Sequence, residues 1–477
     1  MTKQDCFDFI DGAASKLTAL SDDIWEYAEL SLQETRSAKR YVDFLQKADF
    51  TVETNVADIP TAFTATYGAG KPVIGILAEY DALSGLSQKA NSTVKEPLTP
   101  GGCGHGCGHN LLGAGALAAA VGIKQYLSGG HTGTVILFGC PGEEGCASKA
   151  FMAKQDLFRS LDAALTWHPG DTNEIISGSN QASLQVLYRY HGIASHAAET
   201  PHMGRSALDA VELLNVGVQF LREHIPHSDA LHYAILDAGG CSPNVVQPEA
   251  AVLYMLRSDT VPHAQKLLNR LDNIAQGAAL MTDTTMERRF IDGTADTVPN
   301  AVLEQVLYRN MEALGVPSYT DEETAFAAAL RDTYPHEELP GSVWTVDAAA
   351  RAQVTALSEN NTKALSDYLM PYRHTDRQNL GSTDVGDVSY QTPTAQINAV
   401  TWASGSPGHS WQNVSIGKHS IAHKGMLYAG KVLCGAAIDL YEFPDLLAQA
   451  RTEWQVQTAG GYTCPIEDGT IPLHPLI

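Results

Sequence analysis

The chain has few cationic residues for its length. Its 477 residues include 31 Lys and Arg against 54 Asp and Glu, and 31 − 54 gives a formal net charge of −23. Nucleic-acid binding needs a surface that neutralises phosphates, and anionic membranes attract basic clusters. The composition therefore argues against polyanionic partners, and we expect neither nucleic acid nor membrane among the partners of this protein.

The sequence also lacks long apolar runs and an export signal. Its longest apolar runs, such as 111–123, fall well below the roughly 18 residues that span a bilayer. Three aspartates interrupt the N-terminal segment MTKQDCFDFIDGAASKL, which does not have the charged-then-apolar order of a signal peptide. We therefore expect a cytoplasmic protein, whose eight cysteines are reduced thiols or metal ligands rather than disulfides.

Strands alternate with helices in the first part of the chain. The apolar patterns predict strands at 51–55, 62–67, 72–78, 134–138 and 163–167. They predict helices at 6–30, 38–45, 114–127 and 147–155. Such alternation is typical of an α/β sheet covered by helices on both faces. The fold class predicted for this part is therefore α/β.

Between residues 182 and 295 the predicted order becomes strand, helix, strand, strand, helix, strand. This order matches a ferredoxin-like α+β unit, which we expect as an insertion. Helices at 301–314 and 420–440 and a strand near 396–403 then complete the first unit. We predict one domain in two segments, 1–181 and 296–477, around an inserted domain at 182–295. The polar stretch 317–378 permits no assignment.

A glycine-rich segment, GGCGHGCGHN at 101–110, places two Cys and two His close together. Glycine lets the backbone approach an ion closely, and thiolate and imidazole are ligands for zinc and similar ions. The alternative is a flexible turn with buried thiols.

Further candidate ligands follow predicted strands, where ligand sites of α/β sheets lie. Glu143 and Glu144 follow the strand 134–138, and His168 ends the strand 163–167. Adjacent carboxylates cannot point the same way, so one can bind a metal while the other takes a proton from a bound water. Taken alone, this pair is a solvated acidic turn.

Taken in order, these motifs resemble a known family. The runs HGCGHN at 105–110, PGEE at 141–144 and HP at 168–169, with His196 and His409, are similar to the amidohydrolase branch of the aminoacylase and carboxypeptidase clan of di-metal peptidases. The resemblance covers nearly the whole chain. It implies a mixed-sheet di-metal peptidase catalytic domain, with the ferredoxin-like α+β unit inserted as a lid or dimerisation domain.

The resemblance also implies two divalent metal ions that share one thiolate. The implied ligands are Cys107, His109, Glu144, His168 and His409. Manganese is the expected metal and zinc the alternative, because thiolate, imidazole and carboxylate together suit both. Cys103 and His105 are carried over only as supporting or redundant residues. Asn110 replaces the family's Asp, which would orient His109 from behind, and Asp81 is expected to support the site.

The remaining site residues also come from the resemblance. Glu143 corresponds to the general base, and His196 to a residue that contacts the scissile carbonyl, in the site of a partner subunit. Asn244 and Arg257 correspond to substrate-holding positions, and a guanidinium can bind a carboxylate with two hydrogen bonds. Without the resemblance, His196 would be an ordinary capped or core histidine and Arg257 a surface salt-bridge residue.

We therefore expect a metallo-amidohydrolase that cleaves a small N-acyl or N-aroyl amino acid, with p-aminobenzoyl-glutamate as the leading substrate. One alternative is a hydrolase of indole-acetyl-aspartate or another N-acyl amino acid. Another is a non-catalytic conjugate-binding subunit of a hetero-oligomer, although the intact ligand set argues against it. A homodimer and a heterodimer with a paralogous subunit both remain open.

Overall fold

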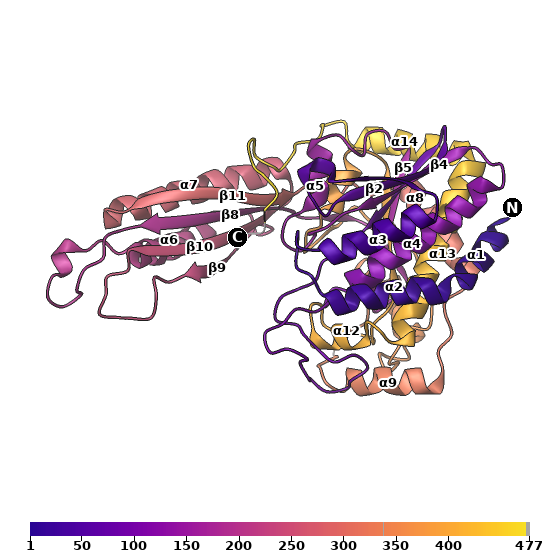
Figure 1. Cartoon of the computed structure of the whole chain (residues 1–477), viewed down its shortest axis with the longest axis horizontal. Helices are drawn as coiled ribbons and strands as arrows, with labels where there is room; N and C mark the ends of the chain where they lie inside the picture. The colour runs from indigo at the N-terminus through magenta and orange to yellow at the C-terminus, as the bar shows by residue number, and fades with distance from the viewer. Residues whose placement is uncertain (337, 474–477) are drawn as a thin grey trace.

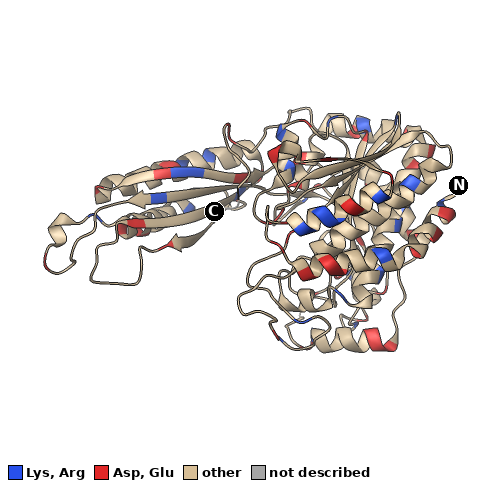
Figure 2. Ribbon diagram, in the orientation of Figure 1, with Lys and Arg blue, Asp and Glu red and all other residues tan. Residues whose placement is uncertain are grey.

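The computed structural model describes residues 1–336 and 338–473, and in it the chain forms two bodies, each built on its own sheet (Figure 1). The larger body holds a seven-stranded sheet and most of the helices. The smaller body, called the lid below, is elongated and extends to one side. In this view acidic and basic positions are interspersed along the ribbons of both bodies (Figure 2).

The larger sheet is mixed. Its strands, in spatial order, are β1 (Thr51–Thr54), β2 (Phe63–Ala69), β4 (Gly133–Gly139), β3 (Val73–Ala78), β5 (Ala163–Gly170), β13 (Thr394–Val400) and β6 (Glu174–Ile176). The four strands β4, β3, β5 and β13 are parallel, whereas β1, β2 and β6 pair antiparallel with their neighbours. Because β13 lies beside β5, the C-terminal part of the chain completes the first sheet, and the mixed sheet is confirmed.

Helices cover both faces of this sheet. One face is packed by α1 (Lys3–Gly12), α2 (Ala14–Tyr27), α3 (Thr35–Lys47), α4 (His109–Ser128), α8 (Ala301–Leu314), α13 (Ser420–Glu442) and α14 (Pro444–Gln457). The other face is packed by α5 (Ser148–Lys154), α11 (Val385–Ser389) and the base of the lid. The predicted helix at 6–30 is wrong in one respect, because the chain breaks into α1 and α2 at Ala13.

Helix α4 lies in the centre of the larger body. By length and composition it is long and apolar enough to cross a membrane. However, 83% of its most apolar 18-residue stretch is buried inside the protein. Its small residues allow close packing, since a Cβ added at Gly115 would lie 2.7 Å from the Trp167 ring. Its hydrophobicity is therefore that of a core helix. It begins at His109, five residues before the predicted start, so the candidate ligand segment leads directly into it.

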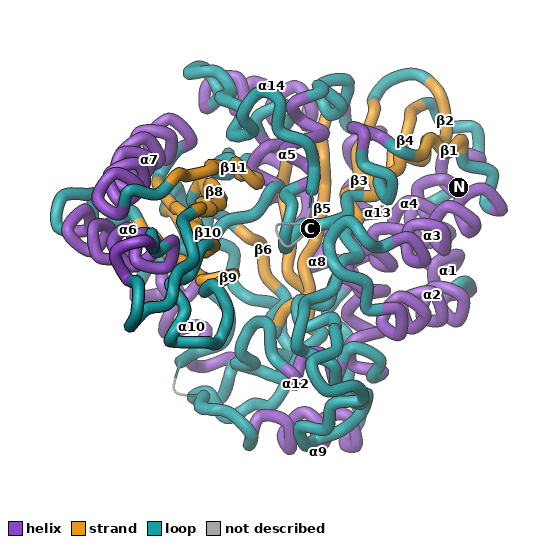
Figure 3. Tube along the Cα trace, turned by 60° about the vertical axis from the view of Figure 1, so that its left-hand side comes forward, coloured by secondary structure: helices purple, strands orange, loops and turns teal. Residues whose placement is uncertain are grey.

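The lid has the predicted ferredoxin-like order. Its elements are β8 (Ala182–His191), α6 (Ala207–Arg222), β9 (Ala230–Asp237), β10 (Glu249–Ser258), α7 (Val261–Thr282) and β11 (Thr285–Thr294). The sheet is antiparallel in the order β11-β8-β10-β9, and α6 and α7 lie together on one side of it (Figure 3). The domain limits 1–181, 182–295 and 296–477 stay a prediction.

The stretch that the sequence left unassigned contains short elements. These are α9 (Asp321–Arg331), the 3₁₀ helix Val343–Thr345, α10 (Ala348–Leu357) and β12 (Gln378–Asn379), which pairs with β7 (Ser179–Asn180). The short helix α12 (Trp411–Ile416) follows β13.

The tail after α14 connects the two bodies. It runs from the larger body to the base of the lid (Figure 1). Lys154 of α5 donates hydrogen bonds to the carbonyls of Ile466 and Glu467, and Arg288 of β11 binds the Glu467 carboxylate through two nitrogens at 2.6 and 2.8 Å. The tail therefore holds the lid against the larger body.

Candidate active site

Residues from four segments meet at the carboxyl ends of the parallel strands. Glu143 and Glu144 follow β4, and His168 lies near the end of β5. Cys107 lies two residues before the start of α4, and His409 lies in the loop after β13. This is the edge at which open α/β sheets bind ligands.

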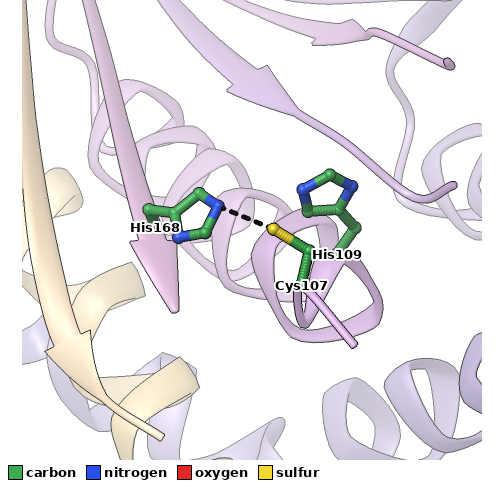
Figure 4. A group of neighbouring side chains, drawn as sticks. All are labelled: Cys107, His109 and His168. Carbon is green, nitrogen blue, oxygen red and sulfur yellow. Dashed lines mark hydrogen bonds between the residues drawn. The ribbon is translucent and has the colours of Figure 1, made fainter. Parts of the chain in front are cut away.

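A first group of candidate ligands consists of Cys107, His109 and His168, whose ligand atoms all lie within 4.8 Å of one another (Figure 4). The Cys107 Sγ atom is 3.4 Å from His168 Nε2. His168 Nδ1 lies 2.7 Å from the Pro169 carbonyl, so Nδ1 carries the proton and Nε2 presents a lone pair to the group. Burial and the neighbouring His109 lower the pKa of His168, which favours this neutral ring.

A second group consists of Cys107, Glu144 and His409, again with ligand atoms within 4.8 Å of one another. His409 Nε2 lies 3.1 Å from Glu144 Oε1. The backbone of His409 is left-handed, with φ of 52°. The structure thus brings all five predicted ligands together, in two groups that share Cys107.

His109 is held from behind by Asp81. Its Nδ1 lies 2.8 Å from Asp81 Oδ1, while the other Asp81 oxygen accepts hydrogen bonds from Ser31 and from the Glu144 backbone. The opposite ring nitrogen, Nε2, is buried and makes no hydrogen bond among the described residues, although it lies 3.3 Å from Glu79 Oε2. A buried nitrogen that faces thiolate and carboxylate groups without a hydrogen bond fits a metal ligand.

The role expected at position 110 is wrong. The Asn110 amide donates to Ser21 Oγ and to the Gly417 carbonyl, at 3.1 and 3.2 Å. It therefore anchors α4 to neighbouring segments and does not orient His109, because Asp81 already occupies the nitrogen that needs orienting.

The site is rich in buried acidic groups. Burial, followed by the nearby Glu144 carboxylate, raises the pKa of the Cys107 thiol well above its usual value. Burial and the carboxylates of Glu79 and Asp384 do the same to the pKa of Glu143. Bound cations invert this effect, since a coordinating thiol loses its proton. The donor set is therefore suited to cations.

Sequence reasoning missed a buried ion-pair chain behind the site. Lys149 Nζ is fully buried and lies 2.6 Å from Glu79 Oε1 and 2.5 Å from Asp384 Oδ1. Glu79 in turn places Oε2 3.3 Å from His109 Nε2. A lysine directly before the apolar residues of α5 was the available signal.

Beside the two groups lies a cleft of about 350 Å³, within the range of small-molecule sites. The larger body lines it with Cys107, Glu143, Glu144, His168 and His409, and the lid contributes Arg257 of β10. Arg257 donates to the Ser382 hydroxyl and has no ion pair with a described carboxylate. The salt-bridge alternative for Arg257 is therefore not supported by the described residues.

His196 and Asn244 lie elsewhere, in loops at the far end of the lid. The Ala197 amide donates to the Asn244 carbonyl at 3.0 Å, so the two loops are joined. Strand β8 runs from Ser183 in the cleft to His191 at that far end, and eight steps along a strand span about 26 Å. These two residues therefore do not meet Arg257 or the metal-ligand groups within one chain.

The ring of His196 is nevertheless set up as a donor. Its Nδ1 accepts hydrogen bonds from the amides of Ala198 and Glu199, at 3.2 and 3.1 Å. In the neutral ring the proton therefore sits on Nε2, and the residue is exposed.

Comparison with known proteins identifies the family. The model of peptidase family M20/M25/M40 matches residues 75–413. The chain belongs to this family. The M20 match includes every candidate metal ligand, and it makes the protein a hydrolase that acts on an amide bond.

Relatives of this M20 chain include a p-aminobenzoyl-glutamate hydrolase subunit of Escherichia coli (strain K12), 43% identical over 98% of this chain and 99% of that one. The Xaa-Arg dipeptidase of Homo sapiens is 29% identical over 66% of this chain and 72% of its own. Among solved structures, an aminobenzoyl-glutamate utilization protein from Klebsiella pneumoniae superposes with a TM-score of 0.58 at 16% identity, over 92% of this chain and 98% of that one.

Proposed function

We propose that the chain hydrolyses p-aminobenzoyl-glutamate to p-aminobenzoate and glutamate, using two divalent ions. The observation that carries the proposal is the pair of three-residue groups that share Cys107, beside a cleft with a carboxylate base and an arginine. The Escherichia coli hydrolase relative, which matches over nearly the full length of both chains, supports the choice of substrate.

The two groups would each hold one ion. His109 and His168 would complete one site and Glu144 and His409 the other, with the Cys107 thiolate common to both. Manganese is the metal we expect, and zinc is the alternative, because the mixed donor set suits both. When bound, a pair of such ions polarises the amide carbonyl and acidifies the attacking water.

The side chains would then perform the proton transfers. Glu143 lines the cleft outside the two groups that share Cys107, although its carboxylate also lies within 4.8 Å of ligand atoms of Glu79 and His109. As the general base it would take a proton from water and return it to the leaving nitrogen. Arg257, which has no ion pair with a described carboxylate, would bind a carboxylate of the glutamate portion.

We also propose that His196 acts in the site of a partner subunit. Its Nε2–H is free to donate to the carbonyl oxygen as negative charge develops there, but it lies at the far end of the lid from its own cleft. The partner would be a second copy or a paralogous subunit, because the relatives include two different subunits of the Escherichia coli hydrolase. The acidic composition is consistent with the cytoplasmic location that we propose.

Hydrolysis assays on the purified chain test the substrate. We expect release of p-aminobenzoate from p-aminobenzoyl-glutamate, lost on chelation and restored by manganese, and slower turnover of indole-acetyl-aspartate. Faster cleavage of indole-acetyl-aspartate would move the assignment to the alternative substrate. Activity that appears only with an added second subunit would favour the non-catalytic role.

Mixing two inactive variants tests the role of His196. After subunit exchange of Glu143→Gln with His196→Ala chains, half of the dimers are hybrids, and each hybrid has one intact site if His196 acts across the interface. The mixture should therefore regain about a quarter of the wild-type activity. The unmixed variants are the controls, and a mixture that stays inactive would contradict action in trans.

A further inference from the structure

One face of the lid sheet lines the cleft with two rows of side chains. In the pairing register, Arg257 of β10, Ser183 of β8 and Thr294 of β11 form one row. Met255, Gln185 and Asp292 form the next, about 7 Å further along the strands. Residues two apart on a strand share a face, and all six line the cleft.

Asp292 is a buried carboxylate that makes few polar contacts. Only 3% of its surface is exposed, and its one hydrogen bond comes from the Gln185 amide at 3.3 Å. Within the described part of the chain its other oxygen has no hydrogen-bond partner, and no Lys, Arg or His forms an ion pair with it. Burial, with a contribution from Asp384, raises the pKa of Asp292 to about 7. Burying such a group is costly unless a ligand supplies a donor.

A β-bulge aims this carboxylate into the cleft. On β11 the register shifts between Phe290, which faces Val186, and Asp292, which faces Gln185. With regular pairing, Ile291 would lie opposite Gln185, and Asp292 would not share the row with it. Bulges next to active sites commonly redirect a side chain in this way.

The cleft therefore has a cationic residue in one row and an acidic residue in the next. Arg257 at one row attracts a carboxylate, and the ionised form of Asp292 at the next row disfavours one through like-charge repulsion. A substrate whose glutamate portion binds at Arg257 can place its other end near Asp292, because both residues line the same cleft in neighbouring rows. A hydrogen-bond donor at that end suits this row, because the ionised Asp292 carboxylate and the Gln185 amide oxygen both accept hydrogen bonds.

We infer that Asp292 and Gln185 form a specificity subsite for a nitrogen donor on the acyl portion of the substrate, namely the arylamine of an aminobenzoyl group. The inference rests on the proposed function and adds residues to it. The same chemistry would suit a cationic side chain of a dipeptide, so the test includes both kinds of ligand.

Substrates that differ only at the para position test the subsite. We expect the wild type to cleave p-aminobenzoyl-glutamate with a kcat/KM about tenfold above that of p-dimethylaminobenzoyl-glutamate, which lacks N–H donors but keeps similar electronics. Unsubstituted benzoyl-glutamate should resemble the dimethylamino compound. The preference should appear mainly in KM, because the donor is remote from the reacting carbonyl.

Variants then assign the preference to residues. Asp292→Leu should reduce the tenfold ratio to near one while leaving benzoyl-glutamate cleavage within a few-fold of wild type. Asp292→Asn keeps an acceptor oxygen and should retain part of the preference. Gln185→Leu, a partly buried neighbour, should reduce the ratio even if Asp292→Leu fails to fold. Glu287→Gln is the matched control, because Glu287 is an exposed carboxylate on the same strand, and it should change nothing.

The outcomes separate the inference from the function on which it rests. Cleavage of all three aroyl-glutamates with equal efficiency, or a preference that survives both leucine variants, would overturn the subsite and leave the proposed function standing. Cleavage of arginyl-glutamate, whose cation lies on the acyl portion, that is lost in Asp292→Leu without any effect on the arylamine preference would assign Asp292 to a cation instead. Failure to cleave any aroyl-glutamate would overturn both.

Discussion

Replacing Glu143 by Gln is expected to lower kcat for p-aminobenzoyl-glutamate by about 10²- to 10⁴-fold. Gln has nearly the same shape but cannot take a proton from water. Glu143 is absent from both groups that share Cys107, so the metal content should not change. Steady-state rates of p-aminobenzoate release, together with elemental analysis of the purified variant, measure the two effects separately.

This variant distinguishes a base from a ligand. Loss of metal along with activity would show that Glu143 coordinates an ion, as its proximity to Glu79 and His109 also permits. A residual rate within tenfold of wild type would place the base elsewhere. The melting temperature should stay close to that of the wild type.

Replacing Cys107 by Ala is expected to remove both ions and all measurable turnover. Its thiolate belongs to both ligand groups, so its loss should affect both metal positions. His168→Ala and His409→Ala should each weaken one position more than the other, because each residue belongs to one group. Metal content per chain after gel filtration measures these differences.

Cys103, the other thiol of the glycine-rich segment, is the matched control. Cys103 lies four residues upstream and belongs to neither group among the described residues. Cys103→Ala should therefore keep both ions and most of the activity. Equal loss of metal in the two cysteine variants would contradict a shared thiolate at Cys107.

Much of this architecture could be predicted because it depends on local patterns. Periodicity and punctuation placed most strands, and the order of elements in the lid identified its topology. The candidate ligands follow strands or precede a helix. The carboxyl ends of parallel strands lie at the ligand-binding edge of the sheet, so the place of these residues in the sequence predicts their place in the fold.

The remainder depends on long-range packing that no local pattern encodes. The ion pairs of Lys149 with Glu79 and Asp384 join residues 70 and 235 positions apart. The bulge that directs Asp292 into the cleft is a matter of pairing register between β11 and β8. The separation of His196 from its own cleft depends on the length of β8, since a motif gives a residue's role but not its distance.

The central claim is a hydrolytic centre of two metal ions that share Cys107. A titration of the metal-free wild-type chain with manganese, and separately with zinc, tests it most directly, with p-aminobenzoate release followed against ions bound per chain. The account predicts that turnover of p-aminobenzoyl-glutamate appears as two ions bind and disappears on chelation. Turnover that is complete with one ion, or that persists in the metal-free protein, would contradict it.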